Sequence, residues 1–194
     1  MNSNTTSETP EVPAKPSKSD FILSCYEWVE ALIPALVIIM VLFTFLFRVI
    51  TVNGPSMMPN LKNGYKVLVS CTDRKLTRGD IVVMDGRGTS LHEIIIKRVI
   101  ATEGQTVNID FNTGVVSVNG VPLDESAYIE NGITKNQYDL SFPQTVPPGH
   151  VFVLGDNRRV SDDSRSSDVG MIDQRYVIGK VQFILMKTEK AGKL

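Results

Sequence analysis

The sequence has few of the residues that build disulfide frameworks or metal sites. It contains two cysteines and two histidines in 194 residues. Cys25 and Cys71 lie on opposite sides of a long apolar run, so we do not expect a disulfide between them. There is no Cys-x-x-Cys pair, and His92 and His150 are far apart in the chain. The sequence therefore predicts neither a metal site nor a cofactor.

The sequence also has no excess of charge of one sign. Twenty Lys and Arg residues face 21 Asp and Glu residues, which gives a formal net charge of −1. Proteins that bind nucleic acids usually carry a basic surplus, so no nucleic-acid partner is expected. The length allows one domain with an anchor and a tail.

Charged residues are missing from Ala31 to Phe47, which are mostly Leu, Ile, Val and Phe. A helix of this length spans about 25 Å, the short end of a membrane crossing. Tyr26 and Trp28 lie where an interfacial aromatic belt is expected, and Pro34 is expected in the first helical turn. The pattern predicts a transmembrane anchor over residues 25–50.

Two other interpretations of the apolar run stay open, a buried core helix and a cleaved signal peptide. The run lies deep in the chain, and no small-x-small cleavage site follows it. Residues 1–24 begin with a stretch rich in Ser, Thr, Pro, Asn, Glu and Lys, which predicts a disordered tail. Lysines and arginines on the two sides of the run leave its orientation undecided.

Beyond residue 50 the sequence changes to short β-branched runs separated by Gly, Asn, Asp and Pro. No useful helical period is present, so residues 51–187 are predicted to form a mainly antiparallel β domain, with a C-terminal tail over residues 188–194. Turns are expected at residues 112–114 and 119–120, and a long surface excursion at residues 124–148. The predicted strands are 66–69, 80–84, 94–96, 106–109, 115–118, 150–154 and 177–186.

Chemistry is concentrated in three segments, Gly54–Leu61, Lys97–Ile100 and Gly155–Arg165. A serine hydroxyl such as that of Ser56 needs a neighbouring base, and neither histidine lies in a pattern typical of a Ser-His-Asp enzyme. A lysine can serve if its pKa falls from ~10.4 towards ~7–8. The isoleucines before Lys97 provide the apolar surroundings that lower a lysine pKa.

The three segments together resemble the motifs of bacterial type I signal peptidases. Ser-Met-x-Pro matches at Ser56, and Arg-Gly-Asp-Ile-Val matches at residues 78–82. Lys-Arg-Val matches at Lys97, and Gly-Asp-Asn-Arg-x-x-Ser-x-Asp-Ser-Arg matches at residues 155–165. The resemblance covers about residues 49–186, and the compact size is similar to that of Gram-positive members.

The resemblance implies a serine endopeptidase that removes signal peptides from exported preproteins, with a fold of two antiparallel sheets. Ser56 is then the nucleophile and Lys97 the general base, and Ser161 orients the lysine. Asp156, Arg98, Asp163 and Arg165 are expected to form supporting ion pairs. Shallow apolar pockets for small substrate residues are expected from Val52, Met57, Leu61, Ile95 and Ile96.

The resemblance also implies a location and partners. The enzyme is expected to be a monomer that crosses the plasma membrane once, near the secretion machinery. Its N-terminus is then cytoplasmic, its catalytic domain extracytoplasmic, and its partners are preproteins and the lipid bilayer. One residue departs from many members, because Gly54 replaces a serine that supports the oxyanion there.

Three other functions stay open from the sequence alone. A self-processing Ser/Lys repressor is soluble and has a DNA-binding head, whereas this chain has an apolar run and a polar tail. A signal peptidase of the endoplasmic-reticulum type has histidine in place of Lys97. A non-enzymatic anchored module needs neither Ser56 nor Lys97.

Overall fold

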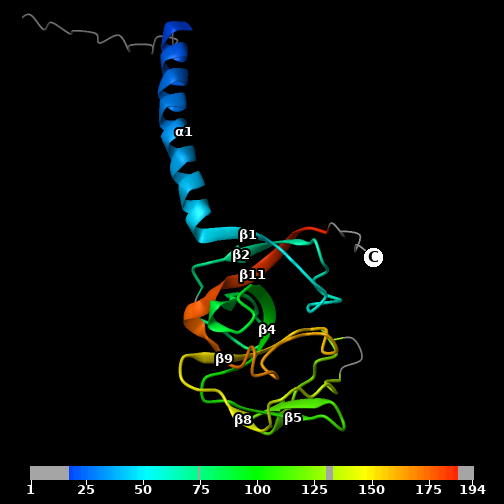
Figure 1. Cartoon of the computed structure of the whole chain (residues 1–194). Coiled ribbons are helices and arrows are strands. Elements are labelled where there is room, and N and C mark those ends of the chain that lie inside the picture. The colour runs from blue at the N-terminus through cyan, green and yellow to red at the C-terminus, as the bar shows by residue number, and fades with distance from the viewer. Residues whose placement is uncertain (1–17, 74, 130–132, 188–194) are drawn as a thin grey trace, which may run out of the picture. The chain divides into compact units, whose positions relative to one another are not determined.

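The computed structural model describes residues 18–73, 75–129 and 133–187. The chain divides into two units, residues 1–43 and residues 44–194 (Figure 1). The predicted C-terminal tail, and the predicted N-terminal tail up to residue 17, lie outside the described residues.

The apolar run lies in helix α1, which extends from Lys18 to Leu46. Pro34 is inside this helix and not in its first turn, because the helix begins well before Ala31. Of the helices in the described ranges, α1 is the one long and apolar enough to cross a membrane, over Tyr26–Leu46, and that stretch is not buried. A soluble core helix would be buried, so this alternative no longer holds.

The helix ends at Leu46, and the next residues form strand β1, Phe47–Thr51. Val49, Ile50 and Thr51 are β-branched, which favours an extended backbone. β1 pairs with β2 in antiparallel register, with Ile50 opposite Val67. The last four residues of the predicted 25–50 anchor, 47–50, therefore belong to this strand. The limits of the anchor stay a prediction.

The larger sheet has seven strands in the order β1-β2-β11-β3-β4-β9-β10, and every pairing is antiparallel. Five of these strands lie where the sequence predicted them, while β1 and β10 were missed. β10 is only two residues long and carries no alternation to detect. The bounds are β2 Lys66–Ser70, β3 Ile81–Asp85, β4 Ile94–Thr102, β9 His150–Leu154, β10 Ile172–Asp173 and β11 Val177–Met186.

The smaller sheet has four antiparallel strands in the order β7-β6-β5-β8. The expected turn at residues 119–120 joins β6 to β7, and Asn119 and Gly120 both have positive φ, 53° and 77°. Two successive residues of positive φ are typical of a tight hairpin turn. The strands are β5 Thr106–Asp110, β6 Val115–Val118, β7 Val121–Pro122 and β8 Gln144–Thr145. The predicted mainly β fold with two antiparallel sheets is confirmed.

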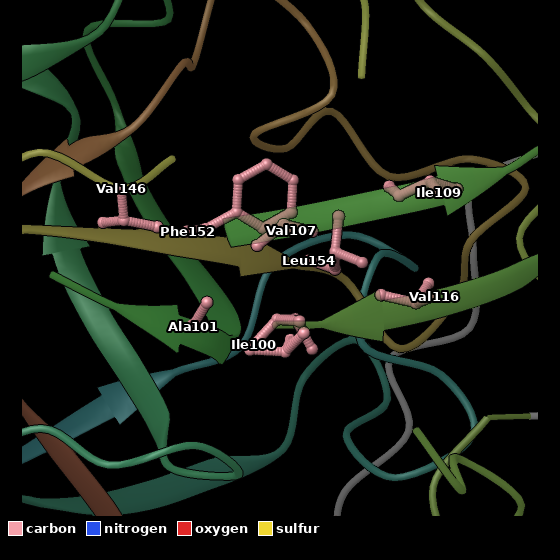
Figure 2. Close-up of a cluster of buried hydrophobic side chains, with 9 residues drawn as sticks. Ile100, Ala101, Val107, Ile109, Val116, Val146, Phe152 and Leu154 are labelled. Atoms are coloured by element: carbon pink, nitrogen blue, oxygen red, sulfur yellow. The ribbon is translucent and has the colours of Figure 1, made fainter. Parts of the chain in front are cut away.

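A cluster of buried side chains joins the two sheets (Figure 2). Val107 and Ile109 from β5 pack with Phe152 and Leu154 from β9. The ring of Phe142 stands edge-on to Phe152, with centroids 5.8 Å apart. Burial of apolar area contributes about 25 cal/mol per Å², so this cluster holds the small sheet firmly against β4 and β9.

Residues 124–148 are not simply the surface excursion that their polarity suggested. Glu125, Ile129, Thr134 and Val146 are buried. Ile129 and Val146 bury apolar surface, and Glu125 and Thr134 contact a buried arginine described below. Apart from β8, the described residues of this segment are irregular in backbone, and the buried ones are part of the packed domain.

Two short 3-10 turns complete the larger sheet's surroundings, η1 at Gly86–Gly88 and η3 at Gln174–Tyr176. Each is preceded by an aspartate whose carboxylate accepts a hydrogen bond from the backbone N–H two residues on, Asp85 for η1 and Asp173 for η3. This Asp-x-Arg turn appears a third time, in buried form, in the site.

Candidate active site

Ser56 lies in a compact turn that follows β1. Met58 N–H donates to Pro55 O at 3.1 Å, and Leu61 N–H donates to Met57 O at 2.8 Å. Met57 and Leu61 are buried at 1% and 2% exposure in a core cluster, which fixes the turn. Ser56 itself stays partly exposed, with its backbone O accepting from Asn157 N–H at 2.9 Å.

Lys97 lies on β4, opposite Val82 of β3, and is only 4% exposed. On the same face of the strand its neighbours are the buried Ile95 and Val99. In the described part of the chain no carboxylate pairs with Lys97. Burial has the largest effect on the pKa of this amine and lowers it. The negative charges of Asp163 and Asp162 raise the pKa, but by less. The expected effect of burial on the Lys97 pKa is therefore confirmed.

Ser56 and Lys97 line one cleft of about 470 Å³. One wall is the end of β1 and the turn that carries Ser56, and the other is the start of β4. Two carboxylates, Glu93 and Asp162, lie exposed in it. The remaining lining comes from Ile50, Thr51, Asn53, Gly54, Pro55, Leu91, Ile94, Ile95, Ile96 and Val160.

The predicted apolar pocket residues divide into two groups. Ile95 and Ile96 line the cleft as expected. Val52, Met57 and Leu61 do not line it, because their side chains turn into the core and pack with Ile96. A sequence position next to the nucleophile does not tell which face of the turn a side chain takes. Ile94, which is 57% exposed, and Leu91 also line the cleft and were not predicted to do so.

The start of β4 has one unpaired edge in the described structure. β3 pairs with all of Ile94–Arg98, whereas pairing to β9 begins only at Arg98. The backbone groups of Ile94 to Lys97 on the β9 side thus border the cleft. An extended peptide can add to such an edge as a further strand.

The segment 155–165 is held by a buried ion pair. Arg165 Nε donates to Asp163 Oδ1 at 2.8 Å and Nη2 to Asp163 Oδ2 at 2.9 Å, and neither side chain is exposed. Asp163 Oδ2 also accepts from Gly155 N–H at 3.0 Å. Gly155 allows close approach here, since a Cβ would lie 2.1 Å from Ser161 Oγ and 2.6 Å from Ser56 O.

A second ion pair, with a hydrogen bond from Asn60, connects β4, which carries Lys97, to the turn that carries Ser56. Arg98 donates from Nε and Nη2 to the two Asp156 oxygens, each at 2.7 Å. Asn60 Nδ2 also donates to Asp156 Oδ2, at 2.7 Å. The four residues predicted to form ion pairs do so, and the structure shows the pairing, which the sequence did not, as Arg98 with Asp156 and Arg165 with Asp163. Their importance for catalysis stays a prediction.

A third buried cluster was missed from the sequence. Arg158 donates from Nη2 to Glu125 Oε1 at 2.6 Å and also donates to Thr134 Oγ1. All three residues are buried. Glu125 and Thr134 come from the segment taken as a surface excursion, where an isolated acid or hydroxyl gives no signal of burial.

Ser161 is fully buried, and within the described structure its Oγ has no hydrogen-bond partner. The expected hydrogen bond to Lys97 is not formed in this structure. Leu154 pairs with Arg98, so the register carries Gly155 and the adjoining Ser161 next to Lys97. A buried hydroxyl without a partner is costly, which favours a hydrogen bond between Ser161 Oγ and the neighbouring Lys97 amine during the reaction.

Gly54 has φ +83° and donates its N–H to Asn63 Oδ1 at 3.2 Å. An added Cβ would meet nothing within 4 Å, so the backbone conformation, and not lack of space, favours glycine here. A serine at this position would carry the strain of positive φ.

Comparison with known proteins gives one consistent family. The sequence model of the protein family described as "Signal peptidase, peptidase S26" matches residues 25–186. The chain is 37% identical over 178 residues to Signal peptidase I of Bacillus licheniformis, covering 88% of this chain and 93% of that protein. It is 32% identical over 174 residues to Signal peptidase IB of Staphylococcus aureus strain COL, covering 81% and 87%.

The chain is also similar to solved structures, among them the crystal structure of a signal peptidase I from Enterococcus faecalis V583. It shares 35% sequence identity with this chain, with a TM-score of 0.42, and covers 56% of this chain and 97% of the other.

Proposed function

Because the chain belongs to the signal peptidase family, peptidase S26, we propose that it is a membrane-anchored serine endopeptidase that removes signal peptides from exported preproteins with a Ser56 nucleophile and a Lys97 base. The observation that carries the proposal is a buried lysine, with a lowered pKa and no paired carboxylate in the described structure, in the same cleft as Ser56. Binding alone would not need this arrangement.

In the proposed reaction Ser56 Oγ attacks the carbonyl carbon of the scissile bond while its proton passes to Lys97 Nζ. The negative oxygen that develops is stabilised by the Ser56 N–H. When the C–N bond breaks, Lys97 returns the proton to the leaving amine. Water then attacks the Ser56 ester while Lys97 takes a proton from it, and Lys97 gives that proton to Ser56 Oγ as the ester C–O bond breaks, which frees the signal peptide. Ser161 Oγ accepts from the protonated Lys97 amine during these steps.

The substrate binds in an extended conformation along the open edge of β4. The backbone of Ile94 to Lys97 supplies hydrogen bonds to any sequence, and alternate substrate side chains face the cleft. Ile95 and Ile96 restrict the space to small apolar groups. This mode suits an enzyme that accepts many preproteins sharing only small residues near the cleavage site.

We propose that the predicted anchor, residues 25–50, crosses the plasma membrane with its helical part, up to Leu46, and that the β domain beyond it acts as a monomer on the outer side, near the secretion machinery. The apolar helix is consistent with an anchor. Protease treatment of intact cells is expected to remove residues 60–194 and to spare an N-terminal epitope tag. Immunoblots for tags at the two ends measure this; loss of the N-terminal tag alone would reverse the topology.

The proposed activity is tested by incubating the full-length protein in liposomes with one reporter preprotein that has an Ala-x-Ala site. Cleavage at that site, identified by the N-terminal sequence of the product, supports the proposal. Absence of cleavage, or cleavage elsewhere, would contradict it.

The pH dependence of this cleavage tests the base. Neutral Lys97 is the active form, so kcat/KM should rise as the pH rises through the Lys97 pKa, which burial lowers from its usual range. Asp162 raises that pKa, so Asp162→Asn should move the rise to lower pH. Asp124→Asn, which removes an exposed carboxylate that does not act on Lys97, should leave it in place. A shift to higher pH in Asp162→Asn would contradict the assignment.

A further inference from the structure

A second cleft borders the catalytic cleft beyond the turn that carries Ser56. It measures about 270 Å³ and is lined by Met58, Ile133 and residues 156–160. Val160, 52% exposed, lines both clefts and so marks where they meet. Asn157 fixes this segment against the nucleophile, through its N–H to Ser56 O at 2.9 Å and its Nδ2 to Pro55 O at 3.3 Å.

The reaction at a serine places the two halves of a substrate on opposite sides of the nucleophile. In the proposed function the signal-peptide side lies along Ile94 to Lys97 in the first cleft. A chain that continues past Ser56 crosses Val160 and enters the second cleft. This cleft therefore lies where the residues after the scissile bond, the start of the mature protein, must pass.

The charges around the second cleft are not equivalent. Asp156 and Arg158 are buried and ion-paired, Asp156 with Arg98 and Arg158 with Glu125. Arg159 is exposed, and its guanidinium contacts no carboxylate of the described residues. Met58 and Ile133, 38% and 40% exposed, add apolar walls. Among the described residues that line it, the free charge at this cleft is thus positive, whereas the exposed charges of the first cleft, Glu93 and Asp162, are negative.

We propose that the second cleft binds the first residues of the mature protein and that Arg159 favours an acidic side chain there over a basic one. This specificity rests on the proposed function, since it concerns the other half of the same substrate. Ion pairs of exposed groups contribute modestly, so attraction of an acid together with repulsion of a base should change kcat/KM about two- to ten-fold.

The test uses full-length protein in liposomes and preproteins identical except for Glu, Gln or Lys at the second, third or fourth mature residue. At one or more positions the wild type should cut in the order Glu, Gln, Lys. Arg159→Glu should reverse the order at the same position, and Arg159→Gln should bring the Glu-to-Lys ratio of kcat/KM near one. Added salt should also reduce the wild-type ratio towards one.

Arg175→Glu is the matched control. It reverses the charge of an exposed arginine that lines neither of the two clefts, so it should keep the wild-type order. An order that is the same in wild type and Arg159→Glu, or the absence of any order in the wild type, would overturn the inference while cleavage itself still supports the proposed function. If the wild type cuts no preprotein, the proposed function fails first.

Discussion

Cleavage of the reporter preprotein is expected to fall to background in both Ser56→Ala and Lys97→Met. The first variant removes the attacking oxygen and the second removes the base while nearly keeping its volume. Loss of a nucleophile or of a residue needed by its base costs about 10⁴-fold or more in kcat in other serine hydrolases. Single-turnover cleavage in liposomes, followed on gels, measures the loss.

Both variants should stay folded, which separates chemistry from stability. Ser56 lies at the edge of a cleft, and methionine suits the apolar surroundings of Lys97 better than an amine does. Ser126→Ala and Lys66→Met, which change exposed residues away from the cleft, should keep the wild-type rate. Wild-type activity in Lys97→Met would exclude the lysine as base and leave only the broader peptidase assignment.

The strands were predictable because they are coded locally. Runs such as Val151–Leu154 and Ile94–Ile96 are rich in β-branched residues, and the structure has strands there. The lowered pKa of Lys97 was predictable for a related reason. Its apolar neighbours on β4 are adjacent in sequence, so any sheet that buries this strand also buries the lysine.

Other features depend on contacts between distant parts of the chain. Glu125 and Thr134 are buried because Arg158 needs partners, and nothing in their own neighbourhood in sequence signals this. Val52, Met57 and Leu61 were placed in the substrate pocket because they flank Ser56, but the turn directs them into the core. β1 was taken as the end of the anchor, because Phe47, Val49 and Ile50 continue the apolar run on both sides of Arg48.

The second large effect is expected at the buried pair Asp163–Arg165. Arg165→Met should lower the free energy of unfolding by about 3–5 kcal/mol, because it leaves the Asp163 carboxylate buried without its partner. Arg165 also donates to Asn136 O at 2.8 Å and Ser161 O at 3.2 Å, and these acceptors lose their donor as well. Denaturant unfolding of the full-length protein in detergent, followed by the fluorescence of tyrosines in the β domain, measures the change.

The chain offers a matched control for this pair. Asp173 and Arg175 have the same two-residue spacing and a similar geometry, with Nη2 to Oδ2 at 2.6 Å, but the Arg175 side chain is 86% exposed. In Arg175→Met, water can solvate the Asp173 carboxylate that loses its partner. The substitution should therefore leave the free energy of unfolding unchanged within the error of measurement. Equal destabilisation by the two arginine substitutions would show that burial of the Asp163 pair is not what makes it important.

The double variant Asp163→Leu/Arg165→Met separates the structural from the catalytic importance of this pair. Replacing both partners by apolar residues removes the unpaired buried charge, so much of the stability lost in Arg165→Met should return. Activity should not return with it, because Gly155 N–H loses its acceptor in Asp163 and the segment next to Ser56 and Lys97 is no longer fixed. Asp163 raises the Lys97 pKa more than Arg165 lowers it, so removing both charges should lower that pKa, and any remaining activity should rise at lower pH than in the wild type. Recovery of full activity together with stability would mean that the pair only holds the loop together, and that the geometry of the dyad does not depend on it.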